Sequence, residues 1–377
     1  MAIDKVVSAS ITDGTITSSD LASGAVQNQS AFKNIVINGD MRLAQRATSA
    51  SSLTSSGYHT LDRYISVIDG AGTWTQSRST TAPTDQGFDT SLKMDCTTAD
   101  GSLAATDMLV VQQRFEGQML QYLKKGTSNA ESLTASFWVR SNKTGTYICE
   151  LRDINNTRYI SKSYTISSAD TWEKKELTYA GDTTGELGNN NSASLYLTFW
   201  LAAGSNFSSG TLGTSWHTTG ANRAVGQVNL ADSTSNEWYI TGIQLEAGTV
   251  ATDFEHLPLD VTTTRCQRYY QKSYDLDTAP GTATDVGVYW TGSTSDSSGN
   301  ASFLPSYKTT LRSSPTLTGY ARDGTSGEGS YFRNGASGNG TLNSHMRGQM
   351  SSSVYINIGA NYTAGTVASH VTLDSEL

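Results

Sequence analysis

The 377-residue chain lacks several features that mark common classes of protein. It has no run of about 18 apolar residues, so no transmembrane helix is expected. Its N-terminus, MAIDKVVSASITDG, lacks the apolar core of a secretory signal. The formal net charge is −8, and no basic tract of the kind that binds phosphate backbones is present. We therefore expect no membrane insertion, no Sec secretion and no nucleic-acid partner.

Cysteine is scarce, and Cys96, Cys149 and Cys266 lie far apart in the sequence. An odd count without short spacings argues against a disulfide framework and against a zinc site. We expect three small, buried hydrophobic side chains in a protein that is made in a reducing cytosol.

Catalytic signatures are also missing. No histidine has an HExxH context or a histidine partner four residues away, and there is no GxSxG elbow, Walker A or Rossmann glycine pattern. Carboxylates are plentiful, but glycosidases pair theirs through the fold, which a sequence does not reveal. We predict a protein that is not an enzyme and has no cofactor. Oxygen-rich loops could hold a structural calcium, but no aspartate spacing demonstrates one.

Small, polar and β-favouring residues are abundant, with 35 glycines and 18 tyrosines against 9 phenylalanines. Threonine and tyrosine favour half-buried pleated surfaces, and glycine favours tight turns. The composition predicts an all-β protein with many loops, and the length suggests two or three domains. A short helix is plausible only around Met108 to Lys125.

A large β domain is expected over residues 31–260. The segments Leu133–Arg140 and Leu195–Leu201 alternate aliphatic or phenylalanine side chains with other residues. Numerous strands joined by Gly, Asn and Ser loops favour a two-sheet sandwich, most simply a jelly roll. Gly248 ends the last strand and Pro258 blocks regular pairing just beyond it.

A smaller, glycine-rich β domain is expected to follow over residues 262–377. Its segment 322–340 consists almost entirely of turn-forming residues. This segment is either a recognition loop that exposes Tyr331, Phe332 and Arg333 or a mobile connector.

Residues 1–30 have a different period, because Ile11, Ile16, Leu21 and Val26 fall five positions apart. Neither an α-helix nor an ordinary strand has that spacing. A single chain this thin cannot bury four aliphatic side chains. We interpret the segment as an extended stem for attachment or trimerisation, with a disordered leader as the alternative.

Aromatic residues on the outside of the expected sandwich suggest carbohydrate binding. Trp138, Tyr196 and Trp200 fall opposite the apolar rows of their strands, and Trp238 is assigned to the same outer surface. Such a surface can stack on sugar rings while polar groups fix their orientation. Packing against another sheet, domain or subunit is the alternative. The candidate carbohydrate-binding residues are Trp138, Arg140, Tyr196, Trp200, Trp216 and Tyr331.

Polar residues near the domain boundary are expected to stabilise the fold rather than to bind a ligand. Gln244 and Glu246 share a strand face, and Glu246 would need a partner if it were buried. We expect them to tie the last strand to the corner that follows. His256 is expected to lock this corner through hydrogen bonds.

The phrases of the chain resemble tail-fibre and minor virion structural proteins of tailed bacteriophages. ITDGTITSSDLASGAV resembles repeats near fibre N-termini, and NIVINGDMRLAQR with TLDRY resembles the opening of a carbohydrate-binding-module-like jelly roll. SFWVRSNKTGTY, TWEKKELTYAGDTTG and YITGIQLEAGTVATDFEH resemble its later strands. RCQRYYQKSY, LPSYKTTLRSSPTLTGY and VTLDSEL resemble a small C-terminal fibre module. The motifs are short, but their ordered series spans nearly the whole chain.

The resemblance implies a homotrimeric virion fibre that is made in the host cytoplasm. Its stem would dock on tail or neck proteins, with Ile11, Ile16, Leu21 and Val26 serving attachment and assembly. Its body and tip would bind a host cell-surface glycan through weak contacts that multiply when several copies engage. A non-receptor fibre of head or neck is the first alternative, and a polysaccharide depolymerase is a more remote one. A free cellular carbohydrate-binding module would have no use for the stem.

Overall fold

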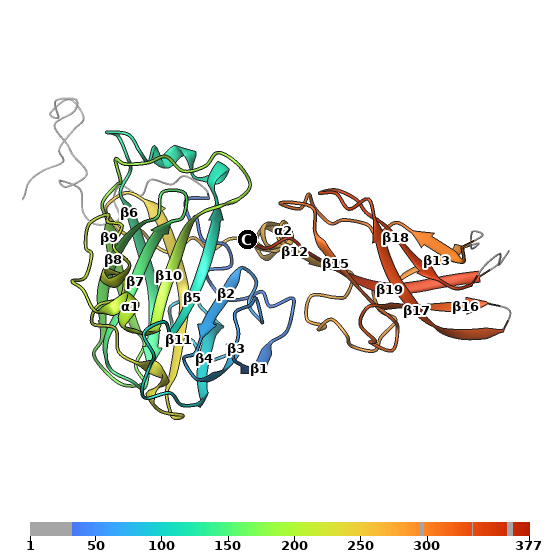
Figure 1. Cartoon of the computed structure of the whole chain (residues 1–377), viewed down its shortest axis with the longest axis horizontal. Helices are drawn as coiled ribbons and strands as arrows, with labels where there is room; N and C mark the ends of the chain where they lie inside the picture. The colour runs from blue at the N-terminus through green and yellow to red at the C-terminus, as the bar shows by residue number, and fades with distance from the viewer. Residues whose placement is uncertain (1–31, 294–297, 334, 360–364) are drawn as a thin grey trace, which may run out of the picture.

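The computed structural model describes residues 32–293, 298–333, 335–359 and 365–377. The predicted stem residues Ile11, Ile16, Leu21 and Val26 lie outside these ranges. The described chain is almost entirely β structure, as predicted, with a jelly-roll sandwich and a smaller C-terminal sheet (Figure 1). No helix in the described ranges is long and apolar enough to cross a membrane.

The first sheet of the sandwich has six antiparallel strands in the order β1-β3-β4-β11-β6-β9. Its strands are β1 (Ser49–Leu53), β3 (Thr73–Ser79), β4 (Ser91–Thr98), β6 (Leu133–Ser141), β9 (Glu173–Tyr179) and β11 (Glu237–Ala247).

The second sheet has five antiparallel strands in the order β2-β5-β10-β7-β8. Its strands are β2 (Tyr64–Asp69), β5 (Met108–Glu116), β7 (Gly145–Asp153), β8 (Arg158–Ile166) and β10 (Ala193–Ala203). The chain crosses repeatedly between the two sheets, so that β10 lies between β5 and β7 while β11 lies between β4 and β6.

The two sheets bury one apolar core between them. The alternation predicted for β6 and β10 is confirmed, because Phe137 and Phe199 point inward and their rings lie 5.0 Å apart. Burial of a side chain of this size stabilises a fold by about 1.5–3 kcal/mol. The three cysteines are buried and free, as predicted.

A bulge in β11 changes which side chains face the core. The pairing of β11 with β6 shifts between Thr241 and Gln244, and Gly242 there has a φ of 61°. Before the bulge Trp238 faces the core, and after it Ile243 does. The prediction that Trp238 lies on the outer surface was therefore wrong, since a period of two does not continue through a bulge.

The prediction of a short helix around Met108 to Lys125 was also wrong for the first half of that segment. Met108–Glu116 forms β5, which pairs with β2 on one side and β10 on the other. Short 3₁₀ turns follow at Gly117–Met119 and Gln121–Leu123. The described α-helices are α1 (Ser205–Ser208) and α2 (Leu259–Gln267).

The C-terminal sheet is built around its long strand β19. Strands β12 and β15 pair with one half of β19, and β13 and β16 pair with the other. Its strands are β12 (Tyr270–Lys272), β13 (Tyr289–Ser293), β14 (Asn300–Phe303), β15 (Thr316–Tyr320), β16 (Glu328–Arg333), β17 (Ala336–His345), β18 (Ser353–Asn357) and β19 (Gly365–Asp374). Residue 262, the predicted start of this domain, falls within α2.

The turn-rich segment 322–340 is neither a long loop nor a connector. Its glycines are accommodated in the hairpin β16–β17, in which Tyr331 pairs with Gly338 and Gly329 pairs with Gly340. Glycine in a strand permits the close approach of another group, and a Cβ atom on Gly338 would lie 2.8 Å from the Tyr331 hydroxyl.

Charged residues join the C-terminal sheet to the sandwich. Arg46 of the sandwich region donates from Nη2 to Asp374 Oδ2 at 2.9 Å, and the buried Arg63 pairs with Glu376. In the other direction, Arg268 donates to both carboxylate oxygens of Glu116, each at 2.7 Å. The junction is therefore a network of ion pairs around the segment that follows β19.

Candidate functional site

The candidate carbohydrate-binding residues of the sandwich do not form one surface. Trp138 and Arg140 lie on β6 of the six-stranded sheet, whereas Tyr196 and Trp200 lie on β10 of the five-stranded sheet. Each points away from the core, so the two pairs occupy opposite sides of the sandwich. The alternation along a strand predicts which side chains face the core and which face outward, but it does not show which sheet the strand joins.

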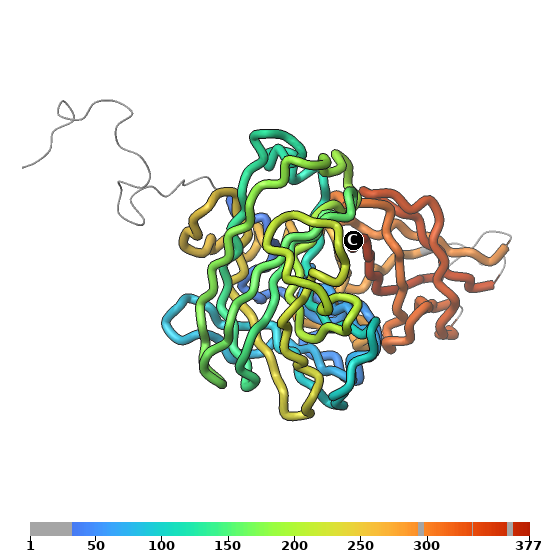
Figure 2. The backbone as a smooth tube through the Cα atoms, turned by 60° about the vertical axis from the view of Figure 1, so that its left-hand side comes forward, coloured from blue at the N-terminus to red at the C-terminus, as the bar shows by residue number. Residues whose placement is uncertain are grey.

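Trp200 is covered by the long loop that follows β10. Its side chain is 0% exposed, its ring centroid lies 5.3 Å from that of Phe207, and Arg223 lies 5.0 Å from its ring. Figure 2 shows this yellow-green loop in front of the strands of the sandwich. Trp200 therefore anchors the loop and cannot contact a ligand in this conformation, contrary to the prediction.

Trp216, in the same loop, is half-buried against the sandwich core. Its Nε1 donates to the backbone oxygen of Ala180 at 2.7 Å, and Lys125 Nζ lies 5.2 Å from its ring. The loop itself is fixed to the edge of the sheet, because Tyr159 and His217 form a β-bridge. Trp216 therefore has a structural partner on each side.

Tyr331 is half-buried against the small core of the C-terminal sheet. The neighbouring Phe332 stacks instead on Trp290, with 5.2 Å between ring centroids, and Arg322 lies over both rings. Trp290 is 54% exposed and was not among the predicted candidates. An aromatic ring directly before the polar stretch TGSTSDSSG is a sequence signal that could have identified it.

The outer face of the six-stranded sheet contains a hollow of about 240 Å³ beside Trp138, here called the Trp138 hollow. Three further rings line it, and they contact one another with centroid separations of 4.8–5.4 Å. Gln86 and Lys174 add polar groups to the lining. The main lining residues are Gln86, Phe88, Trp138, Lys174, Phe254 and His256.

The bulge in β11 shapes this hollow. A Cβ atom on Gly242 would lie 2.6 Å from the Phe88 ring, so only glycine fits beneath that ring. The corner segment that carries Phe254 is held by Thr252, whose backbone N donates to Glu246 Oε1 at 2.9 Å. Gln244 Nε2 also donates to Glu246 Oε1, at 2.8 Å, which confirms the structural role predicted for this pair.

His256 takes part in the corner through ring contacts. Its imidazole packs against Phe88 at 5.4 Å and against Phe254 at 4.8 Å, and its side chain is exposed. Within the described ranges these contacts, rather than the predicted hydrogen bonds, position His256.

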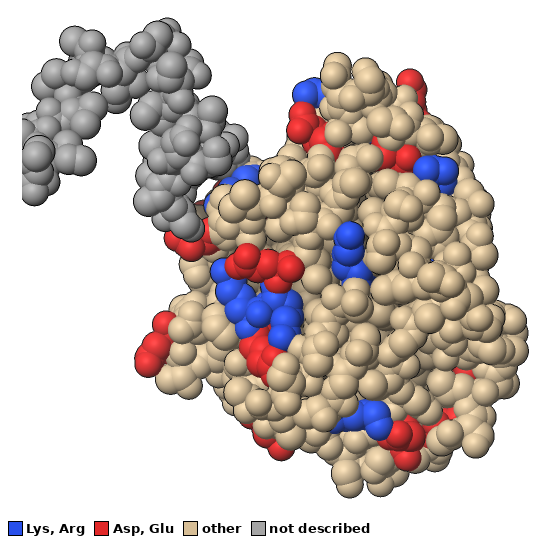
Figure 3. All heavy atoms as spheres, turned by 90° about the vertical axis from the view of Figure 1, so that its left-hand side faces the viewer, with Lys and Arg blue, Asp and Glu red and all other residues tan. Residues whose placement is uncertain are grey.

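Arg140 lies two residues beyond Trp138, but its guanidinium already has protein partners. It donates from Nη2 to Asp170 Oδ1 at 2.9 Å and from Nε to the Asp170 backbone oxygen at 3.0 Å. It also lies over the ring of Tyr239, 4.8 Å from the centroid. Figure 3 shows a face of the molecule on which Lys and Arg lie close to Asp and Glu, with no large surface of one sign.

One cluster of loop oxygens at the edge of the sandwich surrounds an ammonium group. Lys125 Nζ lies 2.5 Å from Asp153 Oδ2 and 3.0 Å from Asp182 Oδ2, and it donates to the backbone oxygens of Thr184 and Gly185 at 3.0 Å each. Burial raises the pKa of Asp182, but hydrogen bonds from Arg158 and Lys125 outweigh it, so the net pKa is lowered. Among the described residues, no group of three or more His, Cys, Asp or Glu could hold a metal ion.

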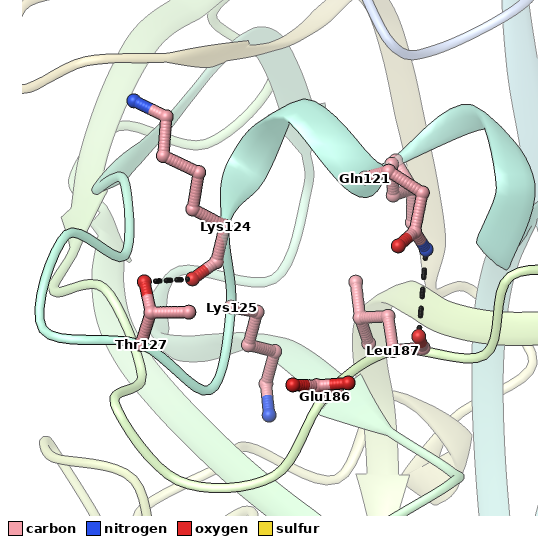
Figure 4. A pocket seen from close by; sticks show the side chains of 7 residues that line it. Gln121, Lys124, Lys125, Thr127, Glu186 and Leu187 are labelled. Carbon is pink, nitrogen blue, oxygen red and sulfur yellow. Dashed lines mark hydrogen bonds between the residues drawn. The ribbon is translucent and has the colours of Figure 1, made fainter.

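A second hollow, of about 310 Å³, lies beside Lys125 (Figure 4). Lys124 and Lys125 point in opposite directions there. Gln121 Nε2 donates to the backbone oxygen of Leu187 at 3.4 Å, and Thr127 Oγ1 donates to that of Lys124 at 2.8 Å. These polar groups are engaged within the protein, so the Trp138 hollow is the better candidate site.

No protein-family model matches the chain, and no curated protein matches it. Among solved structures, the chain is similar to the enzymatically active domain of tailspike protein 4 of bacteriophage CBA120, at 13% identity over 58% of this chain and 22% of that one, with a TM-score of 0.32. It is also similar to a putative sugar binding protein from Bacteroides thetaiotaomicron, at 12% identity over 57% of this chain and 99% of that one, with a TM-score of 0.31. A family 11 carbohydrate-binding module from Clostridium thermocellum, in complex with a mixed-linked tetrasaccharide, shows 9% identity over 55% of this chain and 99% of that one, with a TM-score of 0.27.

Proposed function

We propose that this chain is a fibre protein of a tailed-bacteriophage virion that attaches the particle to host-surface glycans without catalysing a reaction. The virion part of the proposal rests on the ordered phrases that resemble phage fibre proteins along nearly the whole sequence. The binding part rests on one observation, the Trp138 hollow on the outside of the sandwich.

The chemistry of the hollow suits a sugar ring. Sugar C–H groups pack against aromatic faces, and Trp138 is half-buried in the lining of the hollow. Gln86 and Lys174 are exposed at the rim, where they can bond to hydroxyl groups. A volume of about 240 Å³ is below the range of about 300–1,000 Å³ that is typical of ligand pockets, so we expect a single sugar residue.

Weak binding of one sugar residue becomes useful when several copies act together. In this proposal the chain forms a homotrimer, and residues 1–30 attach it to tail or neck proteins of the virion. Simultaneous engagement of several sites raises the overall affinity by orders of magnitude without any new contact. The protein would therefore act in the virion as a reversible adhesin.

A glycan array of bacterial capsule and O-antigen oligosaccharides tests the binding part directly. We expect the full-length protein to bind a subset of these glycans and the Trp138→Ala variant to lose that binding. Trp290→Ala is the matched control, because it removes an exposed tryptophan that lies on the C-terminal sheet rather than in the hollow. Retained binding in Trp138→Ala would rule out the hollow, and an array without any signal would favour a non-receptor fibre.

The native mass of the full-length protein, beside a version that lacks residues 1–30, tests the assembly part. A trimer that becomes monomeric on truncation would support assembly through the stem. A trimer that survives truncation would place assembly in the β domains, and monomers in both forms would contradict a self-assembling fibre.

A further inference from the structure

An alternating row of arginine and tyrosine crosses the five-stranded sheet, on the side of the sandwich opposite the Trp138 hollow. Tyr196 on β10 pairs with Arg114 on β5 and with Arg152 on β7, and Arg152 pairs in turn with Tyr159 on β8. Directly paired residues of neighbouring strands point to the same face of a sheet. The four side chains therefore form one continuous row, here called the arginine–tyrosine row.

The tyrosine rings hold the two guanidinium groups in place. The Cζ of Arg114 lies 4.9 Å from the ring centroid of Tyr196. The Cζ of Arg152 lies 5.8 Å from the same ring and 5.7 Å from that of Tyr159. These separations are within the range of about 6 Å over which a cation is attracted to an aromatic face. Tyr196 is half-buried and stands between the two arginines.

The hydrogen-bonding capacity of these arginines is largely unused. The Nε atoms of Arg152 and Arg114 are both buried and have no hydrogen-bond partner. Arg114 donates from Nη1 to the backbone oxygen of Leu377 at 2.7 Å, whereas Arg152 has neither a hydrogen bond nor an ion pair with any described residue. A buried N–H donor without a partner costs folding free energy. An arginine has five N–H donors in all, so each of these side chains can donate further hydrogen bonds.

Carboxylates on the same two strands are already engaged elsewhere. Glu150, two residues before Arg152 on β7, accepts two hydrogen bonds of 2.8 Å from Arg223. Glu116, two residues after Arg114 on β5, is bonded to Arg268. Neither glutamate therefore pairs with the arginines of the row, and among the described residues the row has no Asp or Glu side chain as an ion-pair partner.

We propose that the arginine–tyrosine row binds a saccharide that carries an oxyanion, either a carboxylate or a phosphate group. Arg152 and Arg114 would bind the oxyanion, because the planar guanidinium matches the geometry of both groups. Tyr196 would pack against the sugar ring that carries it. The site lies on a different face from the Trp138 hollow and does not depend on it.

Isothermal titration with four probes tests this proposal on the full-length protein. The probes are trigalacturonate, glucose 1-phosphate, neutral maltotriose and inorganic phosphate. We expect at least one acidic saccharide to bind, with a higher affinity than maltotriose. Its affinity should fall between about 20 mM and about 300 mM NaCl, because salt screens exposed charges. Inorganic phosphate should bind at least about tenfold more weakly, since it lacks the ring that Tyr196 contacts.

Arg152 is the decisive position because its guanidinium contacts the tyrosine rings but has no hydrogen bond or ion pair with a described residue that a substitution would break. Arg152→Met should lower the affinity for the acidic saccharide by about tenfold or more. Arg152→Lys should have an intermediate effect, because lysine keeps the charge but lacks the planar guanidinium group. Arg347→Met is the control, since Arg347 is an exposed arginine of the C-terminal sheet region.

Three results would overturn the proposal: no binding of either acidic saccharide, binding that Arg152→Met leaves unchanged, or binding of inorganic phosphate as tight as that of the saccharide. The last result would reduce the row to a site for free oxyanions. The Trp138→Ala array experiment examines the other face of the sandwich, so either proposal can fail without the other.

Discussion

The sandwich and the C-terminal sheet are both antiparallel β structures, but their cores differ in kind. The sandwich encloses large side chains such as Trp74, Phe137 and Trp238 between two facing sheets. The C-terminal core is a cluster of mostly small aliphatic residues, with Phe303 as its buried aromatic member. A larger double-layered structure buries a greater fraction of its surface, so the sandwich has more apolar stabilisation of its own.

This difference indicates where the C-terminal sheet obtains additional stability. The segment after β19 inserts its acidic residues among arginines of the sandwich region, and Glu376 is bonded to Arg63 and Arg46. Leu377 accepts hydrogen bonds from Arg114 at 2.7 Å and from the Tyr58 hydroxyl at 2.9 Å. We infer that the C-terminal sheet depends on the junction, whereas the sandwich depends on its own interior.

The largest effect is expected inside the sandwich, at Lys125. Lys125→Met would leave the buried carboxylate of Asp153 without its cation, and breaking a buried ion pair typically costs about 3–5 kcal/mol. The free energy of unfolding, measured by urea denaturation, should fall by this amount. Lys124→Met is the matched control, because Lys124 forms an exposed ion pair with Glu131 that contributes about 0–1 kcal/mol. Equal effects of the two substitutions would contradict the structural role of Lys125.

A smaller and more local effect is expected at the junction. Glu376→Gln would leave the buried Arg63 without its charged partner, and a hydrogen bond to a charged group contributes about 1.5–3 kcal/mol. Amide hydrogen exchange should accelerate in β12 and β15 and change little in β6 and β10. Asp277→Asn is the control, since the pair of Asp277 with Arg78 is exposed and 3.7 Å long. Uniform acceleration in both regions would mean that the sandwich and the C-terminal sheet unfold as one unit.

The same contrast explains which features could be predicted from the sequence. The alternation in Leu133–Arg140 and Leu195–Leu201 correctly indicated which side chains face the sandwich core, because one face of each strand is buried. The hairpin β16–β17 was missed because its many glycines are typical of turns.

The binding surfaces were harder to predict because they depend on long-range pairing. Trp138 and Tyr196 were placed on one surface, yet their strands belong to different sheets. The bulge at Gly242 turned Trp238 inward, and the loop that follows β10 folded back over Trp200. Arg152 was missed because its unused donors become apparent only when its cross-strand neighbours are known. Their roles in binding stay predictions for the experiments above.

The smallest expected effect is a pH dependence that belongs to the C-terminal sheet. His370 is fully buried, its ring is stacked on Tyr274 at 3.7 Å, and its nitrogens lie 3.0 Å from Ser273 Oγ and from the backbone oxygen of Thr284. Burial lowers its pKa below the ordinary value of about 6.5. The folded state therefore binds fewer protons than the unfolded state below about pH 6.5, and stability should fall as the pH drops through this range.

The measurement must be local, because burial also lowers the pKa of His59 and His217 in the sandwich region and these groups shift stability in the same direction. Hydrogen exchange in β15 and β19, compared between about pH 7.5 and about pH 5.5, isolates the contribution of His370. We expect the protection of these strands to decrease at the lower pH, after correction for intrinsic exchange, and this decrease to shrink in His370→Gln. An unchanged decrease in that variant would contradict a role of His370 in the acid sensitivity of this sheet.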